Sequence, residues 1–139
     1  MPIISQSRDY NGFVTKSARL NLSGLVDEAM STLSAFKLLI SEKRHANGTR
    51  GIRQSIDAAF EHLGGWQKIS SGGVDWTKQS SSGGQTVGVE VQVSGRSDML
   101  AVDIMHLSEE LTAGTIDLGI IIVPDDELSK FLTDRTPNW

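Results

Sequence analysis

Thr86-Val-Gly-Val-Glu-Val-Gln-Val-Ser94 is the most regular segment of this sequence. Valine occupies every second position from 87 to 93, so one face of the segment is uniformly apolar and the other is polar. A period of two residues is typical of a β-strand that packs one side on a core. Glu90 and Gln92 must therefore share the polar face of a strand.

A helix and a second strand are expected after this segment. Ser97 or Asp98 can cap the helix, which should end near Gly114. Apart from Asp117, residues 116–123 are apolar and largely β-branched, which is typical of a central strand buried on both faces, and Pro124 ends it. A strand–helix–strand unit predicts a right-handed crossover with the two strands parallel. The apolar face expected for the helix consists of Leu100, Ile104, Leu107 and Leu111.

The region before residue 86 predicts a hairpin preceded by two helices. Short strands are expected at residues 66–69 and 74–78, and the Ser- and Gly-rich residues 79–85 form a turn. Apolar residues at helical spacing predict helices at about 25–43 and 52–63. The predicted fold is an α/β sandwich with a central mixed sheet.

The composition describes a folded, single-domain chain. The sequence has 139 residues, of which 38% are hydrophobic and 22% charged, and it contains no cysteine. Disulfides and thiolate metal sites are excluded, and no apolar run approaches the roughly 20 residues that cross a bilayer. The first residues lack the apolar core of a signal peptide, so a cytoplasmic location and no membrane partner are expected.

Charge is distributed unevenly along the chain. Residues 1–80 hold 10 Lys or Arg and 7 Asp or Glu, whereas residues 81–139 hold 3 and 10. A polyanion should therefore meet the first half of the chain. A basic strip there is either a phosphate-binding surface or an ordinary solvated helix end. Its members are Lys37, Lys43, Arg44, Arg50 and Arg53.

Asp75, Glu90 and Gln92 are the residues best suited to chemistry. Neighbouring strands lie about 4.8 Å apart, so carboxylates on one face can converge on a hard cation such as Mg²⁺. Gln92 can hydrogen-bond the attacking water or a phosphate oxygen, and Gly88 leaves room for a backbone phosphate. The same alternation is also typical of the solvent face of any half-buried strand, so both interpretations remain open here.

An acid followed by Glu-x-Gln resembles the PD-(D/E)XK nuclease superfamily, in the form where Gln replaces the usual Lys. Val89-Glu-Val-Gln-Val-Ser94 is similar to the V-E-V-Q-F-S stretch of the BglII-like restriction endonucleases, and Val74-Asp-Trp76 is similar to their I-D-F segment. The likeness covers roughly residues 45–125. It implies a restriction-endonuclease-like α/β sandwich spanning residues 1–139.

The resemblance also implies roles for individual residues. Asp75 and Glu90 would bind Mg²⁺ together with the Val91 carbonyl, and Gln92 would take the third catalytic position. Ser94 would lie near base-reading contacts. The other residues expected to bind DNA are Arg50, Arg53 and Arg96.

The implied activity is that of a type II restriction endonuclease that cuts double-stranded DNA at a specific site. A palindromic target would require a homodimer. One alternative is a DNA-binding module that keeps the fold without cleaving, and another is a protein-interaction domain whose acidic half meets a basic partner. The interval between Asp75 and Glu90 is longer than in the family. The family also continues beyond Trp139, so either a reduced fold or a C-terminal truncation is expected.

The remaining chemically interesting residues are scattered. The three histidines lack the spacing of a zinc site, so each is expected to be a surface or packing residue. Lys78 is expected either near the acidic residues or at a solvated strand end. The tryptophans are expected in the core or at an interface, since no basic cluster surrounds them. The histidines are His45, His62 and His106, and the tryptophans are Trp66, Trp76 and Trp139.

Overall fold

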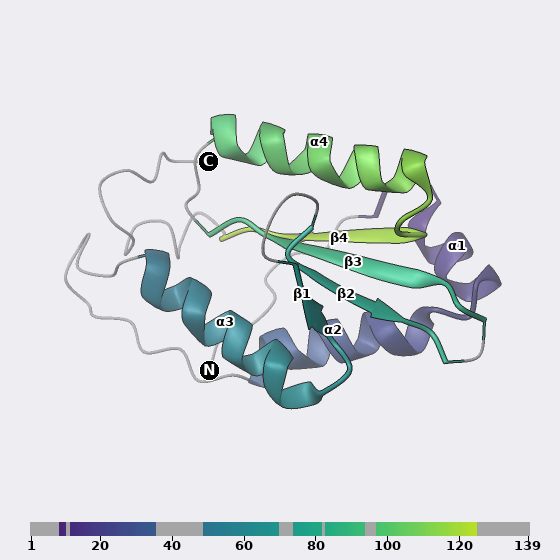
Figure 1. Cartoon of the computed structure of the whole chain (residues 1–139), viewed down its shortest axis with the longest axis horizontal. Helices are drawn as coiled ribbons and strands as arrows, with labels where there is room; N and C mark the ends of the chain where they lie inside the picture. The colour runs from purple at the N-terminus through teal and green to yellow at the C-terminus, as the bar shows by residue number, and fades with distance from the viewer. Residues whose placement is uncertain are drawn as a thin grey trace.

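The computed structural model describes residues 9–10, 12–35, 49–69, 74–81, 83–93 and 97–124. Within these ranges three helices precede the sheet, and a fourth helix lies between its last two strands (Figure 1). The helices are α1 (Phe13–Arg19), α2 (Ser23–Ala35), α3 (Thr49–Leu63) and α4 (Ser97–Ala113). The strands are β1 (Gln67–Lys68), β2 (Trp76–Gln79), β3 (Thr86–Val91) and β4 (Leu118–Ile122).

The four strands form one mixed sheet in the order β1-β2-β3-β4. β1, β2 and β3 pair antiparallel, and β3 pairs parallel with β4 across α4. The predicted hairpin, the parallel pair and the mixed sheet are therefore confirmed. The prediction that residues 116–123 form a central strand is wrong for the described sheet, where β4 lies at the edge with four half-buried residues. Apolar β-branched runs suit edge and central strands alike, so composition could not separate them.

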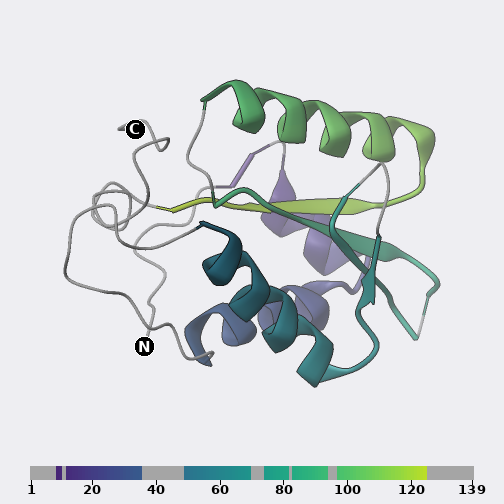
Figure 2. The same ribbon diagram turned by 60° about the vertical axis from the view of Figure 1, so that its left-hand side comes forward.

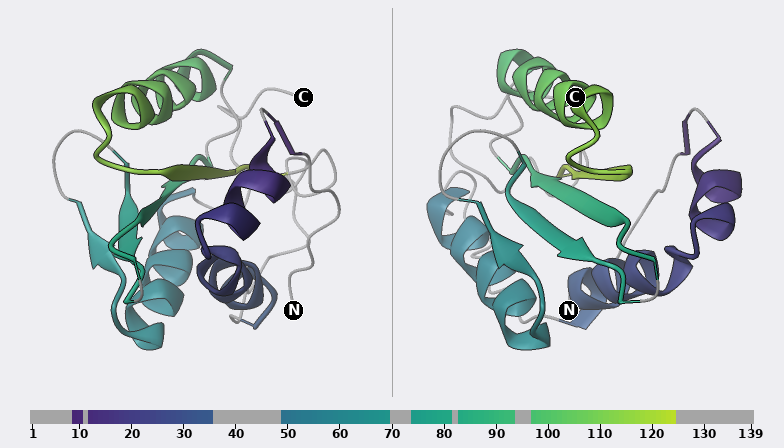
Figure 3. Two further views of the ribbon diagram at one scale, coloured as in Figure 1. Left: turned by 90° about the vertical axis from the view of Figure 1, so that its right-hand side faces the viewer. Right: turned by 45° about the vertical axis from the view of Figure 1, so that its right-hand side comes forward.

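The elements form three layers, with α4 over one face of the sheet and α2 and α3 over the other (Figures 1 and 2). The same arrangement is seen when the molecule is turned to show the hairpin between the two helical layers (Figure 3). The alternation in β3 explains these layers, because Val87, Val89 and Val91 belong to the core that also contains side chains of α2 and α3. The intervening residues of β3 face α4.

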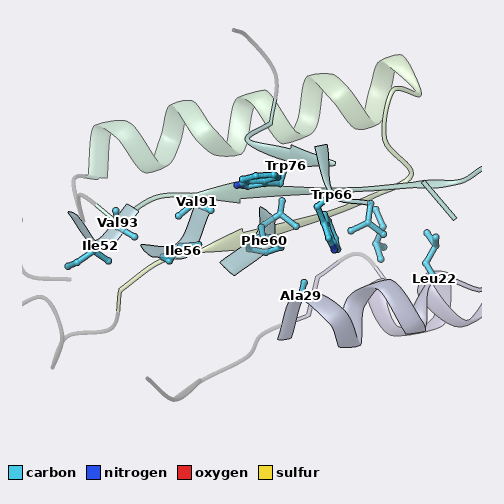
Figure 4. Packing of buried hydrophobic residues seen from close by; sticks show 12 residues of the cluster. Leu22, Ala29, Ile52, Ile56, Phe60, Trp66, Trp76, Val91 and Val93 are labelled. Atoms are coloured by element: carbon cyan, nitrogen blue, oxygen red, sulfur yellow. The ribbon is translucent and has the colours of Figure 1, made fainter. Parts of the chain in front are cut away.

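The two cores are unequal in size. The larger one lies between the sheet and the helices α2 and α3, where Phe60 stacks on Trp76 and meets Trp66 edge-on (Figure 4). The smaller one, under α4, consists of Val74, Leu107 and Ile116, with Ile121 packed against it. Trp66 and Trp76 are thus core residues, as expected, and Trp139 lies outside the described residues.

One of the first two helices was not expected from the sequence. α1 was not predicted, because seven residues after Gly12 show too short a pattern to indicate a helix. α2 begins at Ser23, near the predicted start. The expected extension over 36–43 and the short helix after Pro124 fall outside the described residues. Among the helices that the structure describes, none is long and apolar enough to cross a membrane.

α4 presents a different face to the sheet from the one predicted. Leu107 is buried, but Ile104 is 52% exposed and Leu111 38% exposed. Asp103, which is only 8% exposed, faces the sheet instead. The predicted apolar stripe was wrong because α4 also carries apolar residues on its outer side, including Val102 and Met105, so no single stripe stands out.

Candidate active site

Glu90 of β3 and Gln92, which directly follows the strand, lie beneath α4 on the polar side of the strand. Their exposed fractions are 4% and 7%, so the interpretation of this side as a solvent face is wrong. The side-chain amide of Gln92 donates a hydrogen bond to Oδ2 of Asp103 on α4, at 2.5 Å. A buried acid and amide are costly unless they are paired or bind a ligand, so this layer invites a functional explanation.

Asp75 lies directly beside Glu90. β2 pairs with β3 through Trp76 opposite Val89, and continuing this antiparallel register by one residue brings Asp75 opposite Glu90. Residues directly opposite one another in an antiparallel pair point to the same face. The two carboxyl groups are within hydrogen-bonding reach, and Asp75 Oδ2 also accepts a hydrogen bond of 2.7 Å from the backbone N–H of Val91.

The buried carboxyl groups hold their protons more tightly than free acids do. Burial first, then a hydrogen bond with Asp75 and the charges of Asp75 and Asp103, together raise the pKa of Glu90 from 4.5 to about 9, while Arg53 opposes the shift. Burial also raises the pKa of Asp103, against the hydrogen bond from Gln92. A bound cation would stabilise the charged form of carboxyl groups that lie this close together.

Arg53 places a positive charge beside Asp75 and the Val91 carbonyl. Its guanidinium reaches from α3, donating a hydrogen bond to the Val91 carbonyl at 3.1 Å and forming a short ion pair with Asp75. Asp57, one helical turn along α3, supports the guanidinium at 3.6 Å and accepts a hydrogen bond from the Trp76 indole. Arg53 therefore contacts the same carboxylate and carbonyl that the sequence analysis assigned to a metal ion.

A hard cation fits the residues present. Oε2 of Glu90 is buried without a hydrogen-bond partner, which leaves an acceptor available to a cation. The Val91 carbonyl and the Asp75 carboxylate already hold a positive group, the Arg53 guanidinium. Oxygen donors of this kind are the ligands that Mg²⁺ prefers.

Asp103 and His106 are site residues that the sequence analysis missed. Both lie on α4, and His106 Nδ1 is 3.9 Å from Glu90 Oε2. One ligand atom each from Glu90, Asp103 and His106 lie within 4.8 Å of one another. The Asp-x-x-His spacing puts both residues on one helix face, which is the signal that could have revealed them. It was overlooked because His106 was expected to be a surface or packing residue, and a different set of residues was expected to form the buried face, namely Leu100, Ile104, Leu107 and Leu111.

Two other sequence expectations need correction. Gly88 does not leave room for a phosphate, because a Cβ there would lie 2.8 Å from Ile116 and 3.1 Å from Val74. It is a packing glycine under the smaller core. Lys78 is neither near the acids nor a free strand end, since its amino group pairs with Glu28 of α2 at 2.8 Å.

The expected DNA-binding residues are only partly described. Arg50 lies in the first turn of α3, but its side chain is not among the described ones, and Ser94 and Arg96 lie outside the described residues. Within the basic strip, Lys37, Lys43 and Arg44 also lie outside them. Of the histidines, His62 is exposed at the end of α3, and His45 lies outside the described residues.

A mixed sheet between helical layers, with an acid and an amide buried on one strand beside a second carboxylate, is a restriction-endonuclease-like α/β arrangement. The model of the family described as Restriction endonuclease BglII/BglIII matches residues 16–139. The chain belongs to this family, which confirms the resemblance seen in the sequence. Membership places it among nucleases, the hydrolases that bind and cut nucleic acid. No curated protein matches the chain.

Proposed function

We propose that this chain is a Mg²⁺-dependent type II restriction endonuclease that hydrolyses phosphodiester bonds of double-stranded DNA at a specific site. The observation that carries the proposal is the cluster of Asp75, Glu90 and the Val91 carbonyl around a positively charged group. Family membership supports the reaction class. The cluster supports the dependence on a divalent cation.

In this proposal Asp75, Glu90 and the Val91 carbonyl hold Mg²⁺. The chemistry that a bound Mg²⁺ supplies is activation of water and stabilisation of charge on the phosphate. The protein's own part is to keep Glu90 buried beneath α4 and Asp75 fixed by the Val91 N–H. Both acids then need little reorganisation when the substrate arrives.

Gln92 takes the third catalytic position. An amide can donate and accept hydrogen bonds but is not a strong base, so it orients the attacking water or a phosphate oxygen without removing a proton. Its bond to Asp103 fixes the amide below α4. The orientation of this side chain therefore depends on α4 as well as on β3.

Binding to DNA is assigned to Arg50, Arg53, Ser94 and Arg96. Arg53 is the member whose side chain is described, and it lies between the acidic cluster and the surface with 33% of its side chain exposed. We further propose that residues 1–139 act as a single domain, and that two copies form a homodimer for a palindromic target.

The test is cleavage of plasmid DNA of mixed sequence by the full chain, with Mg²⁺ and with excess chelator. Discrete fragments are expected with Mg²⁺ alone. Glu90→Gln preserves size and most hydrogen bonding but removes the charge that a hard cation requires. Cleavage should fall by several orders of magnitude. DNA binding should persist, because metal-free Glu90 is already protonated and uncharged at neutral pH, like the glutamine that replaces it.

Glu109→Gln is the matched control, because Glu109 is an exposed acid on the outer side of α4. It should cut DNA at the parental rate. A Glu90→Gln protein that cuts nearly as fast as the parent would disprove the catalytic assignment. A folded parent that binds DNA but never cuts it with any divalent ion would favour the alternative, a DNA-binding module with the nuclease fold.

A further inference from the structure

The structure brings a second ligand cluster against Glu90, on the side of α4. Asp103 and His106 contribute a carboxylate and an imidazole that sit one turn apart on the helix, and their ligand atoms lie within 4.8 Å of each other and of a Glu90 oxygen. Neither residue belongs to the group formed by Asp75 and the Val91 carbonyl. The cluster is therefore a separate set of donors that shares one carboxyl group with that site.

A buried, unpartnered atom points into this cluster. Oε2 of Glu90 has no hydrogen-bond partner although the side chain is only 5% exposed, and it lies 3.9 Å from Nδ1 of His106. A distance of 3.9 Å is too long for a hydrogen bond. A buried carboxyl oxygen without a partner is costly, and a bound cation would satisfy it together with the imidazole.

We propose that Glu90, Asp103 and His106 form a second divalent-cation site, which selects ions that accept nitrogen ligands. An imidazole with two carboxylates suits Mn²⁺, Co²⁺ or Zn²⁺, whereas Mg²⁺ and Ca²⁺ favour oxygen donors. Glu90 is then shared between this site and the all-oxygen site at Asp75. Paired sites that share a carboxylate hold ions about 3.5–4 Å apart in two-metal enzymes.

The geometry requires only small movements. Three ligand atoms about 2.1 Å from a common ion lie roughly 3.0–3.6 Å apart, so atoms that now lie within 4.8 Å of one another need to approach by less than about 2 Å. Asp103 is held in place by the Gln92 amide, and its carboxylate has further lone pairs for an ion. His106 is partly exposed, with 38% of its side chain accessible, so its imidazole has room to turn toward Glu90.

The test is pulsed electron paramagnetic resonance of Mn²⁺ bound to the full chain, with any polyhistidine tag removed and Mg²⁺ in excess to fill the oxygen site. Nitrogen bound directly to Mn²⁺ gives a characteristic modulation of the echo. We expect this modulation in the parent and its loss in His106→Gln. Asp103→Asn should weaken the nitrogen-coupled binding by at least about tenfold, the order expected for loss of a ligand or its support.

Two variants make the result specific. His62→Gln, which removes an exposed histidine at the end of α3, should keep the modulation, and Asp75→Asn should keep it as well. A parent without nitrogen coupling, or a His106→Gln protein that retains it, overturns the proposal. Loss of the signal in Asp75→Asn also overturns it, because one site would then use both sets of ligands. The measurement uses no DNA, so its outcome is independent of whether the chain cuts.

Discussion

Glu90 carries a proton that an exposed glutamate would lose, and this makes stability depend on pH. Its pKa is raised from 4.5 to about 9, mainly by burial and also by the contact with Asp75 and the charge of Asp103. The folded metal-free chain therefore keeps this proton over a range where the unfolded chain has lost it. The resulting stabilisation is complete below pH 4.5 and is lost as the pH rises through 9. Glu90→Gln, which stays neutral in both states, should remove this component.

The measurement is the thermal midpoint of chelator-treated protein between pH 5 and pH 9, followed by circular dichroism. The midpoint of the parent should fall with pH more steeply than that of Glu90→Gln. Glu109→Gln, with an exposed side chain, should follow the parent. Parallel curves for the parent and Glu90→Gln would mean that Glu90 is ionised in the folded state.

Gly88 is required by packing, and its substitution tests the smaller core. In Gly88→Ala the new Cβ would lie 2.8 Å from Cδ1 of Ile116 and 3.1 Å from Val74. Overpacking of this kind typically costs about 1–3 kcal/mol, which urea denaturation can measure. Gly24→Ala in α2 is the control, because nothing lies within 4 Å of the Cβ it would add. It should be neutral or slightly stabilising.

Ile116→Val offers a check on the cause, because it removes the methyl group nearest to the added Cβ. In the Gly88→Ala background it should restore part of the lost stability, although it is mildly destabilising alone. Strictly additive effects would show that Ile116 is not the obstacle.

At the scale of elements, the orientation of α4 can be tested by two substitutions on opposite sides of the helix. Leu107 packs in the smaller core, and its Cδ2 lies 3.1 Å from the position of a Cβ on Gly119, whereas Ile104 is 52% exposed. Leu107→Ala should cost about 2–3 kcal/mol, and Ile104→Ala should stay within about 0.5 kcal/mol. Equal losses of unfolding free energy in urea would mean that Ile104 is buried as well as Leu107, as the sequence suggested.

The strand of the site could be predicted from sequence, but the helix above it could not. Along residues 87–93 a period of two residues assigns Glu90 and Gln92 to one face whatever the tertiary structure is. In α4 the apolar residues occupy several sides, and a buried Asp103 contradicts the usual preference of acids for solvent. Only the neighbouring polar residues of β3 explain why that acid faces inward.

At the scale of the whole molecule, the order of elements was sufficient to predict the parallel pair and the mixed sheet. A strand, a helix and a strand in succession have few ways to pack. The place of β4 at the edge of the described sheet was not predictable, because it depends on which strands lie beside it. The contact of Arg53 with Asp75 was also hidden, since it joins residues of α3 and β2 that no local pattern relates.

The uneven charge of the chain leads to a prediction about DNA binding. Replacing both Arg50 and Arg53 by Ala should weaken binding and reduce its dependence on salt, because fewer counterions are released. Each lost phosphate contact lowers the slope of log affinity against log salt by about 0.9. The slope can be measured with a labelled duplex in chelator, with Arg19→Ala, an exposed residue of α1, as control. An unchanged slope would make the basic strip an ordinary solvated surface.

The unequal cores on the two faces of the sheet also bear on how α4 moves. Among the described side chains, the core under α4 consists of Val74, Leu107 and Ile116, with Ile121 packed against it, whereas α2 and α3 pack on the larger cluster that contains the rings of Phe60, Trp66 and Trp76. Segments with little apolar contact open locally at low free-energy cost. Amide protons of α4 should therefore exchange with deuterated water sooner than those of α3. Each opening of α4 exposes Glu90 to solvent. The rate at which α4 opens should therefore set how fast small ions reach this buried carboxyl group.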